Sequence, residues 1–296
     1  NFGDLLDLVA DQLPDEESAE PEEGPDAIKI AVVGKPNVGK SSLVNAIIGK
    51  ETVIVSDVPG TTRDSIDTKI VRHGVPYILI DTAGLRRKAR ISSDIEFYSF
   101  TRTVRSLERC DVAVVLVDAI EGISTQEMRI IAQVNEAGKG LILAFNKWDL
   151  VDTTEMDGDD YLALARDHAG FADYAPVMFL SAHTKRGVTQ LLEKVDQVKK
   201  MCILRVPTGE LNRVVESITS YYPPPSSSNG RLTKVFYCTQ VKIAPPTFVF
   251  FVNHPESITD SYKRYLSNQL RENFSFEGTA IRVLIRGREG RALREW

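Results

Sequence analysis

The sequence predicts an α/β protein, in which a doubly wound and mainly parallel sheet is followed by a small α+β domain. Over residues 28–203, apolar runs of strand length alternate with helical patterns, as in βαβ units. These runs are apolar almost throughout, which indicates that both faces of the sheet are covered. Residues 204–296 instead follow the order α-β-β-α-β, which suits a second, smaller domain.

Each element is placed by its apolar period and by the turn residues around it. In the first domain, we expect strands at 28–33, 75–81, 112–118, 140–146 and 176–181, with helices at 95–108, 125–137, 161–168 and 189–201. In the second, we expect helices at 207–222 and 260–273, with strands at 232–239, 247–252 and 280–286.

Residues 1–27 stand apart in composition. Residues 1–13 carry apolar side chains at helical spacing, whereas residues 15–26 hold seven acidic residues, two prolines and no large apolar residue. A segment of the second kind cannot bury enough surface to offset its ordering entropy. We therefore expect 1–27 to be the remnant helix of an upstream domain, followed by an acidic disordered linker.

Composition and charge exclude several classes of protein. The net charge is −5, yet residues 201–296 hold thirteen basic and eight acidic residues, so the last third is basic. No apolar run approaches the length of a membrane span, and the start has no secretory pattern. The three cysteines are widely spaced and form neither a disulfide framework nor a zinc pattern. We expect a cytoplasmic protein in a reducing compartment.

The stretch GKPNVGKS, from Gly34 to Ser41, matches G-x-x-x-x-G-K-[ST] between an expected strand and an expected helix. Backbone N–H groups and the positive end of the helix then point at one place, which is a phosphate site. Lys40 is expected at the β/γ-phosphates as a catalytic group, and the Ser41 hydroxyl at Mg²⁺. The contacts are expected from Gly34, Lys35, Pro36, Asn37, Val38, Gly39, Lys40, Ser41 and Ser42.

Two further segments fit the switch regions of such a site. Asp81 opens the stretch DTAG after an apolar strand, where an aspartate holds Mg²⁺ through water and the N–H of Gly84 contacts a γ-phosphate. Between the two motifs lies PGTTRD, residues 59–64. One of its threonines is expected to complete the Mg²⁺ shell, and we favour Thr62 over Thr61 as the metal ligand and catalytic group.

Two motifs at later strand ends predict the base. Asn146, Lys147 and Asp149 belong to NKWD, and the Asp149 carboxylate can accept two hydrogen bonds from guanine that adenine does not offer. Ser181, Ala182 and His183 follow the next strand and would present backbone N–H groups to guanine O6. GKPNVGKS, DTAG, NKWD and the stretch 181–183 each follow the carboxyl end of an expected strand, where open α/β sheets bind ligands. We therefore predict a guanine-nucleotide site. NKWD argues against a P-loop kinase or ATPase.

The residue after DTAG is Leu85, where Ras-like GTPases carry the glutamine that orients water. Leucine cannot hydrogen-bond water, so we expect slow intrinsic turnover unless an ion or a partner supplies the missing group.

Together these motifs resemble the Era-like GTPases of the TRAFAC class, and most closely the second G domain and KH-like domain of the bacterial Der (EngA) family. The resemblance covers residues 28–296. It implies a GTPase domain at 28–203, a KH-like domain at 204–296, and a GTP-hydrolysing factor in assembly of the large ribosomal subunit that binds ribosomal RNA. It also implies that a potassium ion can sit at Asn37, although this asparagine can equally bond its own loop.

The family's first G domain is missing from this sequence, and we expect that upstream domain to dock on the KH-like domain. We also expect the protein to be a monomer. The stretch GREG at 287–290 has the letters of an RNA-clamping GXXG loop but follows a strand, so we do not expect it to clamp RNA. The C-terminal arginines offer either phosphate contacts or a docking face; they are Arg282, Arg286, Arg288, Arg291 and Arg294. The alternative function is a nucleotide-gated ribosome- or RNA-binding module in which hydrolysis is incidental.

Overall fold

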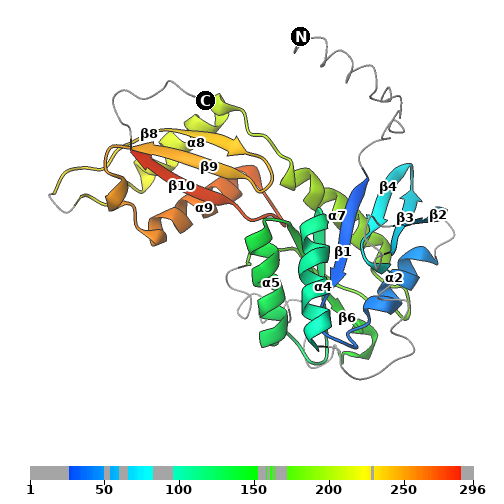
Figure 1. Cartoon of the computed structure of the whole chain (residues 1–296). Helices are drawn as coiled ribbons and strands as arrows, with labels where there is room; N and C mark the ends of the chain where they lie inside the picture. Colours follow the sequence, from blue (N-terminus) through cyan, green and yellow to red (C-terminus); the bar gives the residue numbers. More distant parts are fainter. Residues whose placement is uncertain are drawn as a thin grey trace, which may run out of the picture.

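The computed structural model describes residues 27–49, 54–59, 66–82, 96–152, 158, 161, 163, 172–227 and 230–287. For residues 54–59, 66 and 96–102 it describes the backbone alone. Figure 1 shows two lobes, a larger one built on a seven-stranded sheet and a smaller one built on a three-stranded sheet.

The strands of the larger lobe lie in the order β2-β3-β4-β1-β5-β6-β7. Their bounds are β1 Ile28–Val33, β2 Ile54–Pro59, β3 Ile66–Arg72, β4 Val75–Leu79, β5 Val112–Asp118, β6 Gly140–Asn146 and β7 Val177–Phe179. From β4 to β7 all neighbours are parallel, whereas β2 pairs with β3 and β3 with β4 in antiparallel fashion. The predicted doubly wound, mainly parallel sheet is therefore confirmed, with an antiparallel edge that the sequence did not reveal.

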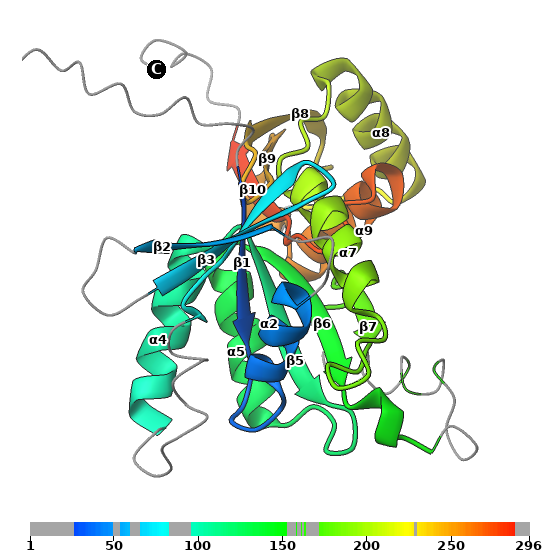
Figure 2. The ribbon, with the colours of Figure 1, turned by 90° about the vertical axis from the view of Figure 1, so that its right-hand side faces the viewer.

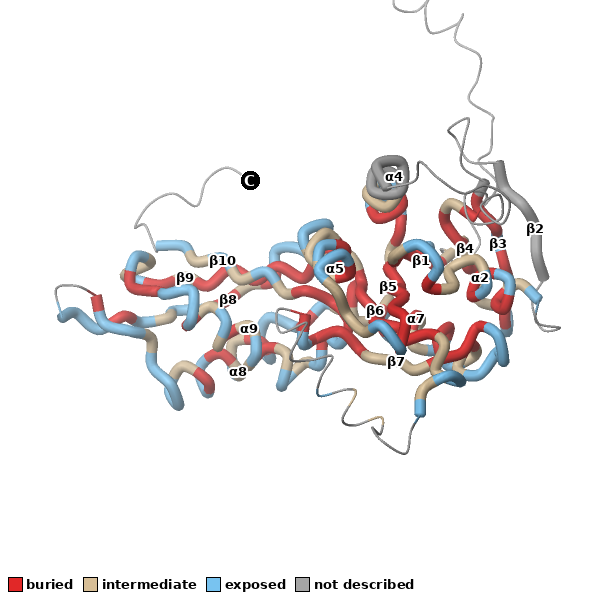
Figure 3. Tube along the Cα trace, turned by 90° about the horizontal axis from the view of Figure 1, so that it is seen from below, coloured by how far each residue is buried: buried red, intermediate tan, exposed pale blue. Residues whose placement is uncertain are grey.

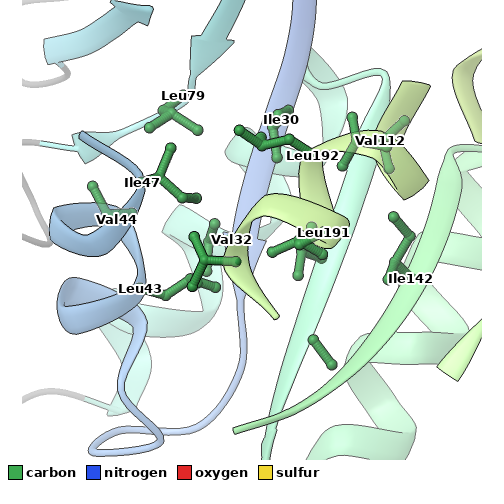
Figure 4. Close-up of a cluster of buried hydrophobic side chains, with 14 of the residues drawn as sticks. Ile30, Val32, Leu43, Val44, Ile47, Leu79, Val112, Ile142, Leu191 and Leu192 are labelled. Atoms are coloured by element: carbon green, nitrogen blue, oxygen red, sulfur yellow. The ribbon is translucent and has the colours of Figure 1, made fainter. Parts of the chain in front are cut away.

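Helices cover both faces of this sheet. Helices α2 (Lys40–Ile48) and α7 (Val188–Cys202) pack on one face, and α4 (Glu96–Arg109) and α5 (Thr125–Ala137) pack on the other (Figure 2). Figure 4 shows Leu43 of α2 and Leu191 of α7 meeting Val32 of β1. The central strands β5 and β6 are buried along their whole length, as Figure 3 shows for β5, because helices exclude water from both sides.

The smaller lobe has the predicted order α-β-β-α-β. Its elements are α8 Thr208–Tyr221, β8 Val235–Lys242, β9 Thr247–Val252, α9 Asp260–Phe274 and β10 Arg282–Gly287. The sheet order is β10-β9-β8, with β8 antiparallel and β10 parallel to β9. Both helices pack on one sheet face around Phe248, Phe250 and Leu266. The first strand begins three residues later than expected, at Val235 instead of residue 232.

The two lobes are joined by hydrogen bonds at the start of β6. The N–H of Leu141 donates to the Gly278 carbonyl at 2.7 Å, and the N–H of Gly278 donates to the Tyr174 carbonyl at 2.8 Å. The Arg271 guanidinium lies 4.7 Å from the centroid of the Tyr174 ring. The start of β6 is thus held by the smaller lobe, while its end carries NKWD.

Some predictions fall outside the described residues. These are the helix and acidic linker of residues 1–26, most of the helix expected at 161–168, the loop 60–65, residues 83–95, and residues 288–296 with Arg288, Arg291 and Arg294. Within the described part of the chain, no helix has the length and apolar character that crossing a membrane requires. The three cysteines are buried free thiols, and none forms a disulfide.

Candidate functional site

The loop between β1 and α2 is shaped by glycines at positions where a side chain would not fit. Gly34 has φ +148°, and a Cβ there would overlap the carbonyl oxygen of Leu116 in β5. Gly39 has φ +99°, and a Cβ there would overlap the side-chain amide of Asn146. Both positions need glycine for conformation and for space. The loop can therefore press its backbone against β5 and β6, as a phosphate cradle requires.

Lys40 is the first residue of α2 and closes the loop on itself. Its ammonium group donates to the carbonyl of Gly34 at 2.8 Å and to the carbonyl of Lys35. Ser41 follows in the first turn of α2, whose N-terminal N–H groups have no intrahelical partners. The predicted lysine, hydroxyl and helix N-terminus are therefore brought to one place.

The other residues of this loop divide by exposure. Val38 is buried in the core beneath α2, whereas Pro36, Asn37 and Ser42 are exposed. Asn37 has φ +65°, a left-handed conformation that asparagine tolerates better than most residues. Its side chain lies where solvent or a ligand can reach it.

Asn146 joins the loop to two other motifs. It ends β6 and is 2% exposed. Its side-chain amide donates to the Val38 carbonyl at 2.8 Å and accepts from the N–H of Ala182 at 2.9 Å. The buried side chain of Asn146 thus fixes the relative positions of the loop after β1, the end of β6 and the SAH stretch, Ser181 to His183, after β7.

Lys147 and Asp149 leave β6 through a tight turn. Lys147 has φ +64° and precedes the 3₁₀ turn η2 (Trp148–Leu150). The Trp148 ring packs on Phe179 with centroids 4.1 Å apart, which anchors the turn. Asp149 is exposed, and a hydrogen bond from the Ser181 hydroxyl lowers the pKa of its carboxyl. Asp149 therefore presents an ionised acceptor beside the SAH stretch.

Residues 181–183 take three different positions. Ser181 is buried, and its hydroxyl accepts from the N–H of Thr184 at 3.0 Å. Ala182 is buried with its N–H committed to Asn146, whereas His183 is exposed. The N–H of Ala182 therefore helps to hold the stretch 181–183 against the end of β6, and the predicted contacts of this stretch with guanine O6 stay a prediction.

Asp81 follows β4, next to the end of β1 in the sheet. It has φ +57°, and its N–H donates to the Asp67 carboxylate at 2.9 Å. Asp67 also pairs with Arg109 of α4, so α4 and β3 fix the backbone at Asp81. The hydroxyl of Ser41 and the carboxylate of Asp81 are hard oxygen donors of the kind that Mg²⁺ prefers, so these residues fit that ion.

Thr61, Thr62, Gly84 and Leu85 lie outside the described residues, and their predicted roles stay predictions. Conversely, two carboxylates outside the predicted motifs, Asp118 at the end of β5 and Glu127 in α5, pair with lysines of those motifs. Two signals could have found them. Asp118 ends an apolar strand at the ligand-binding edge, and Ser124 and Glu127 have the spacing of a capping box.

Two family models match the chain. Residues 29–147 match a family described as "50S ribosome-binding GTPase", and residues 205–286 match "KH-domain-like of EngA bacterial GTPase enzymes, C-terminal". The first match holds the loop, Asp81 and the start of NKWD, and the second spans the smaller lobe.

The chain is also similar to curated proteins named GTPase Der. It is 52% identical over 290 residues to that of Moorella thermoacetica, covering 98% of this chain and 65% of the relative. It is 49% identical over 289 residues to that of Desulfitobacterium hafniense, covering 98% and 65%. The chain therefore spans about two thirds of the length of these relatives.

A solved structure of Era with MgGDPNP and a segment of 16S ribosomal RNA has a TM-score of 0.44 and 17% identity, covering 88% of this chain and 93% of that one.

Proposed function

The chain belongs to the GTPase Der (EngA) family, and we propose that it binds guanine nucleotides and hydrolyses GTP to GDP. One observation carries the proposal: the buried amide of Asn146 bonds both to the loop at Val38 and to Ala182. These two bonds join the loop after β1, the end of β6 and the stretch 181–183 at the carboxyl edge of the sheet, which supports a nucleotide site with a phosphate side and a base side. We assign nucleotide binding to a G domain, residues 28–203, and the remaining residues 204–296 to a KH-like domain.

The phosphate side of the proposed site is formed by the loop and α2. Backbone N–H groups from Gly34 to Ser42 and the dipole of α2 bind phosphate oxygens. Lys40 exchanges its carbonyl partners for the β/γ-phosphates, because charge-assisted bonds to phosphate are stronger than bonds to neutral carbonyls. The lysine thereby stabilises negative charge that develops in the transition state.

Cations complete this side. The Ser41 hydroxyl and Thr62 would ligate Mg²⁺ directly and Asp81 through water, with the Gly84 N–H at the γ-phosphate. Mg²⁺ neutralises phosphate charge when bound. The exposed side chain of Asn37 offers an amide oxygen to a potassium ion, and this residue fits a hard cation because its left-handed backbone projects it from the loop.

The base side is formed by NKWD. The ionised carboxylate of Asp149 accepts hydrogen bonds from guanine N1–H and N2–H₂, and the stem of Lys147 packs on the base plane. An ionised acceptor is what this pairing requires, which the lowered pKa of Asp149 supports. Ser181 and His183 border the base pocket.

The proposed biological role is assembly of the large ribosomal subunit. The family description "50S ribosome-binding GTPase" supports association with that subunit, and the excess of basic residues in 201–296 supports contact with ribosomal RNA. The proposal also includes docking of an upstream G domain on the KH-like domain, a monomeric state and a cytoplasmic location. The buried free thiols suit a reducing compartment.

Phosphate release from GTP tests the activity, with the chain in matched KCl and NaCl buffers. We expect Mg²⁺-dependent hydrolysis that is faster in KCl, and a loss of about a hundredfold or more in Lys40→Ala. Lys200→Ala is the control, because Lys200 is an exposed lysine of α7. Equal rates with GTP and ATP would refute the proposed activity. Binding of GTP without hydrolysis in either salt would favour the gated module instead.

A further inference from the structure

The connection from β5 to α5, residues 118–127, belongs to none of the nucleotide motifs, yet its carboxylates pair with lysines of two of them. We propose that Glu127 and Asp118 are positioning residues of the nucleotide site, Glu127 for the phosphate loop through Lys35 and Asp118 for the base motif through Lys147. This inference rests on the proposed function and assigns the β5–α5 connection as its supporting element.

Glu127 carries a buried charge that needs a partner. Its side chain is 1% exposed. One carboxylate oxygen, Oε2, accepts from the N–H of Ser124 at 3.0 Å and lies 3.2 Å from the Lys35 ammonium. The other, Oε1, is buried and has no hydrogen-bond partner among the residues that the structure describes. A carboxylate so far from water is stable only when it is paired, and Lys35 supplies the opposite charge.

Lys35 transmits this contact to the phosphate loop. Its side chain is tied to α5 through Glu127, while its backbone carbonyl accepts a hydrogen bond from Lys40. The second carboxylate near Lys35, that of Glu121, lies 3.6 Å away and is 64% exposed, so solvent screens it. The buried pair with Glu127 therefore fixes Lys35 at the start of the phosphate loop. Because the Lys35 carbonyl accepts from Lys40, the pair also fixes the position of the Lys40 ammonium group.

Asp118 has the matching role on the base side. Its side chain is 7% exposed and lies 2.5 Å from the Lys147 ammonium. It also accepts from the N–H of Ile120 at 3.0 Å, which fixes the orientation of the carboxylate. Burial opposes its ionisation, but the bonds from Lys147 and the backbone outweigh burial and lower its pKa.

The Lys147 side chain is thereby drawn from a left-handed backbone position toward β5. This direction is set by Asp118, since a free lysine side chain samples many rotamers.

Nucleotide affinity tests both pairs. We would measure dissociation constants for fluorescent GDP and a non-hydrolysable GTP analogue with Glu127→Gln and Asp118→Asn. Each change keeps the size and one acceptor oxygen of the side chain but removes its charge. Each is expected to weaken binding of both nucleotides about tenfold.

Double-mutant cycles separate positioning from general stability. Glu127→Gln is expected to be non-additive with Lys35→Met and additive with Lys147→Met, whereas Asp118→Asn shows the reverse pattern. A purely structural role would lower the melting temperature without this pattern in nucleotide affinity. If a carboxylate variant fails to fold, the double variant that neutralises both partners tests the same pair, because it leaves no unpaired buried charge.

The controls are carboxylates paired away from the nucleotide edge. Asp111→Asn, at the start of β5, removes the charge that pairs with Lys199, and Glu193→Gln removes the charge that pairs with Arg72. Both are expected to bind nucleotide within about twofold of the unmodified chain. If the unmodified chain binds GDP while Glu127→Gln and Asp118→Asn bind equally well, this inference is overturned and the proposed function stands. If the unmodified chain binds neither nucleotide, both fail.

Discussion

At the scale of single residues, the site depends on left-handed backbone conformations at the junctions that follow strands. Gly39 has φ +99°, Lys147 has φ +64° and Asp81 has φ +57°. Such conformations cost free energy in residues with a Cβ, and a surrounding network must hold them. That network is visible here as the bonds of Asn146 to Val38, Lys147 to Asp118, and Asp81 to Asp67.

Gly39→Ala tests this point. The added methyl group would overlap the Asn146 amide, so we expect loss of the bond to Val38 and nucleotide binding at least about tenfold weaker. Gly74→Ala is the matched control, since Gly74 has φ +79° with nothing within 4 Å of its Cβ position. Both variants bear a backbone cost of about 1 kcal/mol. Titration with fluorescent GDP should show the loss in Gly39→Ala alone; equal binding by both variants would contradict the account.

At the scale of elements, the sequence predicts buried strands and capped helices well. The predicted bounds of β1, β5, β6 and α5 match the structure. These strands are apolar throughout, and α5 has Ser124 as its cap with Glu127 and ends at Gly138. The antiparallel strands β2 and β3 were missed. Their segments, IVSDVP and IDTKIVR, mix polar and apolar residues at the sheet edge, and the turn signal Pro59-Gly60 between them was interpreted as part of a switch loop instead of a hairpin turn.

The site was predictable in part because its motifs follow strands that are apolar throughout. Motifs that follow apolar strands are fixed by the topology of a parallel sheet, so the meeting of Gly39 and Asn146 follows from their order. The roles of Asp118 and Glu127 depend on which lysine each reaches. Asp118 pairs with a residue that follows the neighbouring strand β6, and Glu127 pairs from α5 to the loop after β1, and no sequence period predicts either pair. Such contacts appear only when the packing of elements is known.

At the scale of the whole molecule, the two lobes contact each other around residues 275–280. Gly278 accepts a hydrogen bond from the Leu141 N–H and donates its own to the Tyr174 carbonyl. Burial of Arg271 beside Tyr174 lowers the pKa of its guanidinium, which stays protonated at neutral pH and donates to the Phe276 and Thr279 carbonyls. Strand β6 runs from this contact to NKWD, so one strand links the KH-like lobe to the proposed base motif.

Gly278→Ala tests this contact between the lobes. Its Cβ would overlap the Val198 side chain of α7, and its φ is +74°. We expect a destabilisation of about 2–4 kcal/mol from strain and overpacking together. Gly230→Ala has a similar φ of +71° with open space around the Cβ position, so it should cost only about 1 kcal/mol. Urea unfolding of the two variants compares these costs; equal midpoints would show that Gly278 is not tightly packed.

Selection of guanine is assigned to the carboxylate of Asp149, which follows β6. The most direct measurement is competition between GDP and xanthosine diphosphate for the unmodified chain and for Asp149→Asn, with Asp260→Asn as an exposed control on α9. The asparagine amide offers an NH₂ group that can donate to the C2 carbonyl of xanthine and a carbonyl oxygen that can accept from its N1–H. We predict that the unmodified chain and the control prefer GDP and that Asp149→Asn prefers the xanthine nucleotide. An unchanged preference for GDP in Asp149→Asn would contradict the account.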